Sequence, residues 1–201
     1  MDAWQELDEP WRASLELAWE AYRAGTIPVG SVVVAADGEI VARGRNRIFD
    51  PPGRGLAGSR LAHAEVDALS QLPAADRYRD HVLYSTLEPC LLCTAATLLT
   101  TVGRIEYAAS DPFGGACNGS IDTAHWRRSA PEIAAPLGGW PGGLSAALQS
   151  AFWLAHREHP RADLILETFG EESRRAGERV LDLDGAAPRL EHALPQLLDC
   201  L

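Results

Sequence analysis

Residues 81–110, HVLYSTLEPCLLCTAATLLTTVGRIEYAAS, contain the pattern that decides the fold. A short β-rich run at 81–87 is followed by an apolar helical segment at 89–100 and by a second β-rich run at 104–110. A helix that connects two strands as a crossover brings them into one sheet as parallel strands. The stretch therefore predicts an α/β layered fold, in which helices pack on a central sheet.

The segments before this stretch add a hairpin and two helices. Residues 11–24 place apolar side chains at three- and four-residue intervals, as in an amphipathic helix. Residues 29–44 contain two β-rich runs around Asp37-Gly38, a strong hairpin signal, and residues 61–72 return to helical spacing. The predicted sheet therefore mixes antiparallel and parallel pairs.

The sequence after about residue 111 is loop-like at first and then helical. Residues 131–143 are rich in proline and glycine and are expected to form a connector. Helical segments are expected at 144–159, at 162–181 and, as a short helix, within 189–201. We therefore expect one domain over residues 1–125 and a mostly helical C-terminal extension over 126–201, packed on the same domain.

Length and charge limit the classes of protein that fit. The chain has 201 residues, enough for one domain of ordinary size with a full hydrophobic core. It carries 28 acidic residues against 18 basic ones, all of them arginine, which gives a net charge of -10. An acidic surface repels phosphate backbones and so disfavours a nucleic-acid partner.

The acidic N-terminus lacks a secretory signal, and no apolar run reaches the ~18 residues that span a bilayer. We expect a cytoplasmic protein with no membrane partner.

Two of the four cysteines, Cys90 and Cys93, stand close together after Pro89. In a reducing compartment, such a pair is more often metal-binding or catalytic than disulfide-bonded. Positions i and i+3 share one face of a helix, and a helix N-terminus favours the thiolate, the form that binds metal. Two thiolates leave a zinc site incomplete, so further ligands must come from elsewhere.

His63 and Glu65, at the start of the preceding helical segment, could complete that site. His63 would be a third ligand and would leave the fourth tetrahedral position open for water, which is typical of a catalytic zinc. Glu65 would lie near that water and could carry its proton. Taken singly, the cysteines also fit a thioredoxin-like redox pair, and the His-x-Glu fits an ordinary helix start. A redox pair accounts for neither His63 and Glu65 nor Pro89.

Together these residues match HxE…PCxxC, the pattern of zinc-dependent base deaminases. Residues 26–116 resemble the cytidine deaminase superfamily, specifically its branch of tRNA adenosine deaminases, guanine deaminases and related nucleoside deaminases. The matching segments are IPVGSVVV, GRNR, HAEVDAL, LYSTLEPCLLC and VGRIEYAASDPFGGA, in family order. The resemblance implies a three-layer α/β/α fold with a mixed five-stranded sheet, and a homodimer in which the partner helps to close the pocket.

The resemblance also implies the roles of individual residues. It makes His63, Cys90 and Cys93 the ligands of Zn²⁺ and Glu65 the proton shuttle. Asn46, in GRNR, corresponds to a position whose side-chain amide binds the substrate base or ribose, although asparagine is also a common loop-turn residue. The backbone amide of Ala64 would hydrogen-bond the substrate ring.

Two departures from the family bear on the substrate. Relatives that act on tRNA usually have a shorter loop before HAE and a basic C-terminal helix, whereas residues 111–201 carry 13 acidic residues against 8 arginines. This difference argues against tRNA. The loop before HAE carries arginines that could meet a phosphate or could simply be solvated: Arg43, Arg45, Arg47, Arg54 and Arg60.

The extension resembles nothing else in the family. Its aromatic residues could form a lid over the base, or belong to the core or a dimer interface: Trp126, Trp140, Phe152 and Trp153. The remaining cysteines and histidines show no ligand spacing and are expected to be structural: Cys117, Cys200, His125, His156, His159 and His192.

We therefore interpret the chain as a hydrolytic deaminase of a free nucleobase or nucleoside. Zinc-activated water would attack the amine-bearing ring carbon, and ammonia would leave. A tRNA-specific adenosine deaminase is the nearest alternative. A non-catalytic relative that keeps zinc for structure and serves as an interaction module is a second alternative, against which the intact Glu65 argues.

Overall fold

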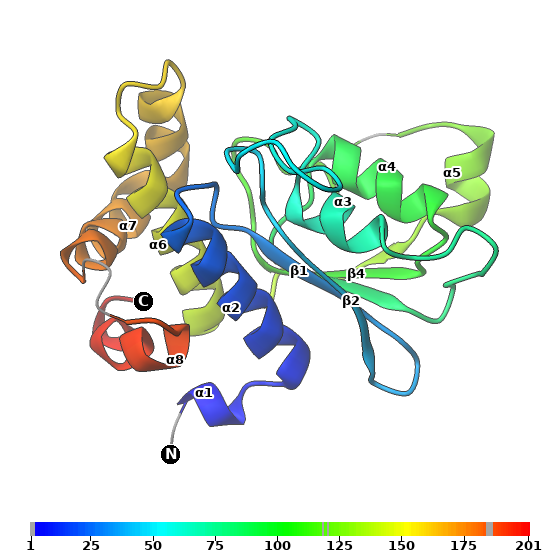
Figure 1. Ribbon diagram of the computed structural model, residues 1–201, viewed down its shortest axis with the longest axis horizontal. Helices are drawn as coiled ribbons and strands as arrows, with labels where there is room; N and C mark the ends of the chain where they lie inside the picture. The colour runs from blue at the N-terminus through cyan, green and yellow to red at the C-terminus, as the bar shows by residue number, and fades with distance from the viewer. Residues whose placement is uncertain (1–2, 118, 120, 184–186) are drawn as a thin grey trace.

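The computed structural model describes residues 3–117, 119, 121–183 and 187–201. These residues form one mixed sheet of five strands in the order β2-β1-β3-β4-β5, with helices on both faces (Figure 1). The strands are β1 (Gly30–Val34), β2 (Ile40–Arg45), β3 (Val82–Leu87), β4 (Arg104–Ala109) and β5 (Glu132–Ile133). β1 pairs antiparallel with β2 and β3, whereas β3, β4 and β5 are parallel. The predicted three-layer fold with a mixed five-stranded sheet is confirmed.

Two pairs of helices cover the two faces of the sheet. On one face lie α2 (Glu9–Arg23) and α6 (Gly139–Ala155), and on the other α3 (Ala64–Leu69) and α4 (Leu91–Leu99). Neighbouring residues of β1 point to opposite layers, because successive side chains of a strand alternate between faces. The Cα of Gly30 faces α2, whereas Val33 packs with Leu69 of α3.

Glycine lets both helical layers approach the sheet closely. A Cβ on Gly30 would lie 2.0 Å from the carbonyl oxygen of Ser14 in α2. A Cβ on Gly44 would lie 2.2 Å from the carbonyl oxygen of Ala64, so only glycine permits this contact between β2 and α3. The N-terminal end of α3 is therefore held directly against the sheet.

The segment 131–143 contains regular structure, and the prediction that it is a connector is wrong. β5 joins the sheet beside β4, and α6 begins at Gly139, five residues before the predicted helix. Gly138 and Gly139 have φ values of 68° and 57°, in the left-handed region that glycine adopts readily. The glycines thus serve the turn into α6.

The remaining helices are α1 (Ala3–Glu6), α5 (Ala124–Ser129), α7 (Ala162–Asp182) and α8 (Leu190–Ala193). α7 packs along α6 and changes direction at Gly170, where φ is 83°. α2, α6 and α7 share a hydrophobic core that includes Trp19, Leu148 and Val180. The helices after residue 126 therefore pack on the same side of the sheet as α2, while the division of the chain at residue 125 remains a prediction.

Candidate metal centre and substrate cavity

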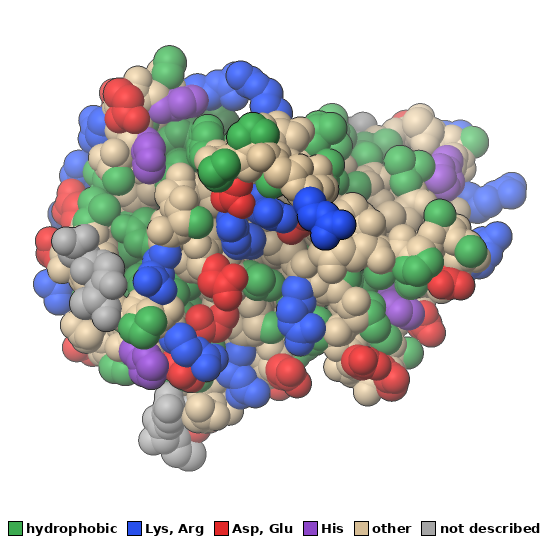
Figure 2. Space-filling model, viewed as in Figure 1, with side chains coloured by type: hydrophobic (Ala, Val, Ile, Leu, Met, Phe, Trp, Pro, Cys, Tyr) green, Lys and Arg blue, Asp and Glu red, His purple; other side chains and the backbone are tan. Residues whose placement is uncertain are grey.

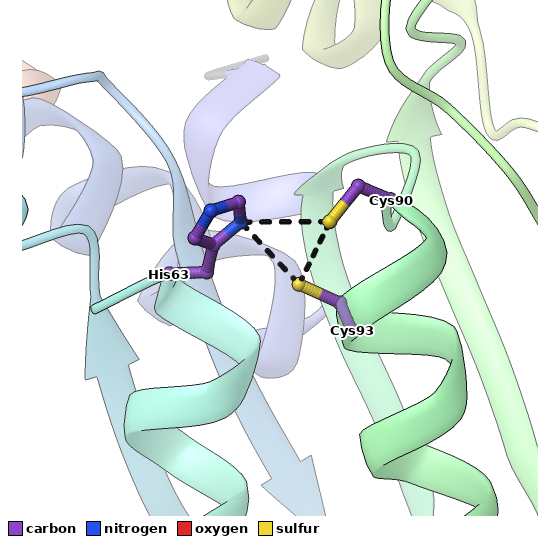
Figure 3. Close-up of side chains that lie close together, drawn as sticks. All are labelled: His63, Cys90 and Cys93. Atoms are coloured by element: carbon purple, nitrogen blue, oxygen red, sulfur yellow. Dashed lines mark hydrogen bonds between the residues drawn. The ribbon is translucent and has the colours of Figure 1, made fainter. Parts of the chain in front are cut away.

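His63, Cys90 and Cys93 lie together where α3 and α4 begin, with their side chains pointing toward one another (Figure 3). His63 has an extended backbone and directly precedes α3, which makes that helix shorter than the predicted 61–72. Cys90 precedes α4 in the same way, and Cys93 lies in its first turn. Pro89 therefore lies before the helix, not in its first turn as predicted. Nδ1 of the histidine and the two Sγ atoms all lie within 4.8 Å of one another.

The spacing of these three atoms fits a tetrahedral zinc ion. Nδ1 of His63 lies 3.6 Å from Sγ of Cys90 and 3.5 Å from Sγ of Cys93, and the two sulfurs are 3.5 Å apart. Tetrahedral Zn–S bonds of about 2.3 Å and Zn–N bonds of about 2.0 Å would put sulfurs about 3.8 Å apart and nitrogen about 3.5 Å from each sulfur. A disulfide would require about 2.0 Å, so the cysteines are free. One nitrogen and two sulfurs leave room for a fourth ligand.

The two thiols of this centre differ in acidity. The hydrogen bond from Cys93 lowers the pKa of the Cys90 thiol to about 4, although burial acts in the opposite direction. The same hydrogen bond and burial raise the pKa of Cys93. Cys90 is therefore a thiolate at neutral pH, and a negative sulfur attracts a cation to the centre.

Glu65 lies in the first turn of α3, behind His63, and is 4% exposed. Its Oε1 accepts a 3.0 Å hydrogen bond from the hydroxyl of Ser85 on β3, and its Oε2 lies 3.3 Å from Sγ of Cys93. Burial raises the pKa of this carboxyl group. The structure thus brings Glu65 to the predicted metal centre with one oxygen fixed by Ser85, a residue that the sequence analysis missed.

Glu88 fixes the loop that follows β4. Its carboxylate accepts hydrogen bonds from the backbone amides of Asp111 at 3.3 Å and Cys117 at 3.2 Å. A Cβ on Gly115 would lie 2.5 Å from the Glu88 carboxyl carbon, so the loop packs closely against this side chain. Glu88 directly precedes Pro89 in the matching segment, but the sequence pattern did not predict that it would bind the loop after β4.

A cavity of about 580 Å³ lies beside the three predicted ligands and Glu65, a size typical of small-molecule sites. The residue before β1 and the loop after β2 contribute apolar and amide side chains to its wall: Val29, Asn46, Ile48 and Phe49. The C-terminal extension contributes a second part of the wall: Gln149, Trp153, His159, Arg161, Ile165 and Phe169. The cavity therefore lies between the family motifs and the extension.

The two predicted substrate-binding residues, Asn46 and Ala64, are both buried. Asn46 lines the cavity and is 3% exposed. Its Oδ1 accepts hydrogen bonds from the hydroxyl of Thr26 at 2.9 Å and the backbone N–H of Ile48 at 3.1 Å. Ala64 is the first residue of α3, and the first N–H groups of a helix have no acceptor within it.

The loop arginines differ in their surroundings. Arg45 and Arg47 both pair with Asp50, at 2.9 Å and 3.1 Å, so the two guanidinium groups share one carboxylate. Arg43 donates to the Ile40 carbonyl and Arg54 is exposed, whereas Arg60 lines the cavity. Of the five arginines, Arg60 is the one that lies next to the site.

The aromatic residues of the extension do not act as one group. Trp153 lines the cavity, whereas Trp140 packs on Trp4 and Phe152 stacks on His156 in the interior. Trp126 lies on α5 and does not line the cavity. His159, expected to be structural, also lines the cavity.

The sequence matches the profile of the cytidine and deoxycytidylate deaminase zinc-binding region over residues 5–109, just over half of the chain. Together with the fold and the His/Cys/Cys centre, this match defines a domain of the zinc-binding deaminase class. The chain belongs to the cytidine and deoxycytidylate deaminase family.

Several named proteins are similar to this chain. A tRNA(Ile)-lysidine synthase of Deinococcus radiodurans is 34% identical over 170 residues, which is 82% of this chain but 25% of that protein. A tRNA-specific adenosine deaminase of Agrobacterium fabrum is 38% identical over 120 residues, 53% of this chain and 70% of that protein. The chain thus spans only about a quarter of the length of the lysidine synthase. A match to 82% of the chain cannot fit within residues 1–125, so it includes part of the extension.

Solved structures share the fold. A tRNA A34 deaminase studied for A-to-I editing at the wobble position has a TM-score of 0.54 and 29% identity, covering 68% of this chain and 95% of that chain. A guanine deaminase from Nitrosomonas europaea has a TM-score of 0.52 at 21% identity, covering 73% and 85%, which supports the fold alone. Among the described residues, no helix is both long enough and apolar enough to span a membrane.

Proposed function

We propose that the protein is a zinc-dependent hydrolytic deaminase of a free nucleobase or nucleoside. The observation that carries this proposal is the second wall of the cavity, which the extension supplies. Trp153 of α6 and Ile165 and Phe169 of α7 line the same cavity as Glu65. A cavity bounded on that side by three apolar side chains, beside Gln149, His159 and Arg161, suits a small planar ring better than a nucleotide within a folded RNA.

In this proposal three residues bind zinc and Glu65 transfers protons. His63, Cys90 and Cys93 hold Zn²⁺, which as a Lewis acid lowers the pKa of water from about 15.7 to about 7. Glu65 takes the proton of the attacking water and passes it first to the ring nitrogen and then to the departing amine. Its burial supports this role, because a carboxyl group with a raised pKa can give back a proton near neutral pH.

Asn46 and the backbone amide of Ala64 orient the ring. Both lie beside the predicted ligands, at the cavity and at the start of α3 respectively. Their hydrogen bonds would hold the amine-bearing carbon at the metal centre, since a ring that is free to rotate would rarely present that carbon to water.

The test is ammonia release from a panel of free bases, nucleosides and one tRNA by the zinc-loaded protein. We expect turnover of a small substrate, reduced on the order of 10²–10⁴-fold in Glu65→Gln with unchanged zinc content. A Glu65→Gln protein as active as the wild type would contradict the proposal. No ammonia from any substrate would favour the non-catalytic interaction module.

A tRNA-specific adenosine deaminase is the second candidate, and the similar proteins favour it. Relatives of that name in Agrobacterium fabrum and Bacillus subtilis are 38% and 34% identical to this chain. On the face shown in Figure 2, basic and acidic side chains are interspersed, without the continuous basic surface that RNA binding favours. Inosine formation in tRNA, with no turnover of small molecules, would establish this second function.

We also propose a homodimer in a reducing, cytoplasmic setting. The exposed side of α4 carries large apolar residues, two next to Cys90 and Cys93 and one at the far end of the helix: Leu91, Leu92 and Leu99. A second copy of the chain would cover this surface, and the family resemblance favours such an arrangement. Sedimentation should give twice the chain mass, and Leu91→Glu together with Leu99→Glu should give the monomer. A wild-type monomer would contradict the dimer.

A further inference from the structure

Two buried amide side chains from different parts of the sequence line the cavity. Asn46 follows β2, whereas Gln149 lies on α6, beyond residues 5–109 of the family match. Each is 3% exposed, and each lines the cavity. Both residues bond to backbone carbonyls before β1. The backbone N–H of Asn46 donates to the carbonyl oxygen of Val29, and Nε2 of the Gln149 side chain donates to that of Pro28.

Hydrogen bonds fix which end of the Asn46 amide faces the cavity. A backbone N–H can only donate, so the side-chain atom that bonds Ile48 must be the oxygen. The hydroxyl of Thr26 donates to the same oxygen, which uses both of its lone pairs. Among the described residues, Nδ2 of Asn46 has no hydrogen-bond partner. Asn46 therefore offers N–H donors to the cavity.

The Gln149 amide is fixed in the opposite sense. A carbonyl oxygen can only accept, so the side-chain atom that lies 3.2 Å from Pro28 O must be the nitrogen. Oε1 of Gln149 has no hydrogen-bond partner in the part of the chain that the structure describes. Among the described residues, Oγ of Ser150 is the one fully buried side-chain atom without a partner, so Oε1 of Gln149 is accessible. A ligand in the cavity with a matching donor could therefore bond to it.

We propose that Asn46 and Gln149 together recognise one edge of a free nucleobase, Asn46 donating to an acceptor and Gln149 accepting from a neighbouring ring N–H. This inference rests on the proposed function and narrows its substrate class. A free base has such an edge at the nitrogen that would carry the sugar: N1–H beside O2 in cytosine, and N9–H beside N3 in the purines. A glycosidic bond removes this N–H, so the pair selects the free base over the nucleoside.

Apolar side chains near Gln149 should increase the preference for the free base over the nucleoside. Trp153, Ile165 and Phe169 share the cavity wall with Gln149. A nucleoside would leave Oε1 of Gln149 without the hydrogen bond that the ring N–H of a free base supplies. Sites built to hydrogen-bond a group discriminate strongly against analogues that lack it, for this reason.

The test measures binding by calorimetry, with the zinc-loaded Glu65→Gln protein to prevent turnover. The probes are cytosine, adenine and guanine, each beside its 1-methyl (cytosine) or 9-methyl (purine) derivative, in which a methyl group replaces the N–H. With Gln149 present, methylation should weaken binding of at least one base about tenfold to a hundredfold. In Gln149→Met, which keeps the length of the side chain but not its acceptor, the difference should fall to about threefold or less.

A control variant separates a structural effect of Gln149 from its role in recognising the base. Gln149→Glu keeps the acceptor and loses the donor to Pro28, so it should retain the effect of methylation. An equal effect of methylation with Gln149 and with Met would mean a steric cause and would overturn the inference, as would failure of all three bases to bind. Turnover by the wild type decides the proposed function separately, because a protein that binds a base in a Gln149-dependent way without releasing ammonia would refute only the enzyme activity.

Discussion

The hydroxyl of Ser85 donates a 3.0 Å hydrogen bond to Oε1 of Glu65, and both side chains are buried. Ser85 lies on β3, paired with Ser31 of β1, so its position is set by the middle of the sheet. Glu65 lies on the short helix α3. The bond therefore connects the predicted proton shuttle to the middle strand of the sheet.

Replacing Ser85 with alanine should lower kcat about tenfold and leave KM and zinc content nearly unchanged. The reason is that the carboxylate loses one fixed oxygen and samples orientations that do not face the substrate, at a cost of about 1–2 kcal/mol. Steady-state kinetics and metal analysis would measure this. Ser85→Thr keeps the hydroxyl and should restore most of kcat; equal losses in both variants would point to packing instead.

Zinc removal should abolish activity and lower the melting temperature. The three predicted ligands join the starts of α3 and α4, so a bound ion stabilises the folded state by linking them. Dialysis against a chelator should shift the thermal transition down by several degrees, on the order expected for loss of a tight ligand, and added zinc should reverse the shift. Differential scanning calorimetry would measure both changes.

Serine substitutions separate the metal centre from the other cysteines. Cys93→Ser should reduce bound zinc well below one ion per chain, because a serine hydroxyl is a poor zinc ligand. Cys200→Ser, near the C-terminus, should bind as much zinc as the wild type. Full zinc occupancy in Cys93→Ser would contradict the assignment of that ligand.

The sequence predicted helices and strands well where the spacing of apolar residues or the local composition is typical of one element. The two β-rich runs around Asp37-Gly38 predicted β1 and β2, and the crossover predicted that β3 and β4 are parallel. β5 was missed because its two residues carry no period and depend on β4 for their hydrogen bonds. The start of α6 was missed because glycine and proline, which usually mark loops, here form the turn into the helix.

The candidate site was predictable only where chemistry constrains the residue type. Zinc requires thiolate and imidazole ligands, so the spacing of Cys90, Cys93 and His63 carried information. Ser85 and Gln149 act through one hydrogen bond each, and many residue types occur at such positions. Only the packing of β3 on β1 and of α6 beside Pro28 brings these two side chains to the site.

Asp50 holds the loop between β2 and α3 through its ion pairs with Arg45 and Arg47. Its side chain is largely buried, at 10% exposure, so the pairs are partly shielded from water. Asp50→Asn should cost about 1 kcal/mol in the free energy of unfolding at pH 7 and make the loop easier to cleave. Urea unfolding and limited proteolysis would measure these effects. Asp37→Asn, in the exposed hairpin turn, is the matched control.

The effect of Asp50 should depend on pH. Burial acts to raise the pKa of Asp50, but the hydrogen bonds from Arg45 and Arg47 outweigh it and lower the pKa below its usual value of 3.8. A lowered pKa adds stability that is complete above the usual value and is lost as pH falls through the folded value. The difference in stability between wild type and Asp50→Asn should therefore be constant from about pH 7 to 5 and shrink below about pH 4. A difference that grows with acidity would contradict this account.

Gly177 marks the closest approach of α7 to α6. A Cβ at this position would lie 2.7 Å from the backbone nitrogen of Ala151 and 2.7 Å from Cβ of Ser150. Alanine is normally favoured over glycine inside a helix by about 1 kcal/mol, whereas forcing a contact of this kind costs about 1–3 kcal/mol. Gly177→Ala should therefore destabilise the protein by about 1 kcal/mol or more and lower its melting temperature by about 2–4 °C.

The same substitution should affect the cavity, since α7 carries Ile165 and Phe169 of its wall. Moving α7 away from α6 would loosen that wall, so we expect KM to rise more than kcat falls. Glu178→Ala, at the exposed neighbouring position, should leave the melting temperature within about 1 °C of the wild type. A Gly177→Ala protein that melts higher than the wild type would mean that helix propensity outweighs the contact, and that the two helices can separate without cost to the fold.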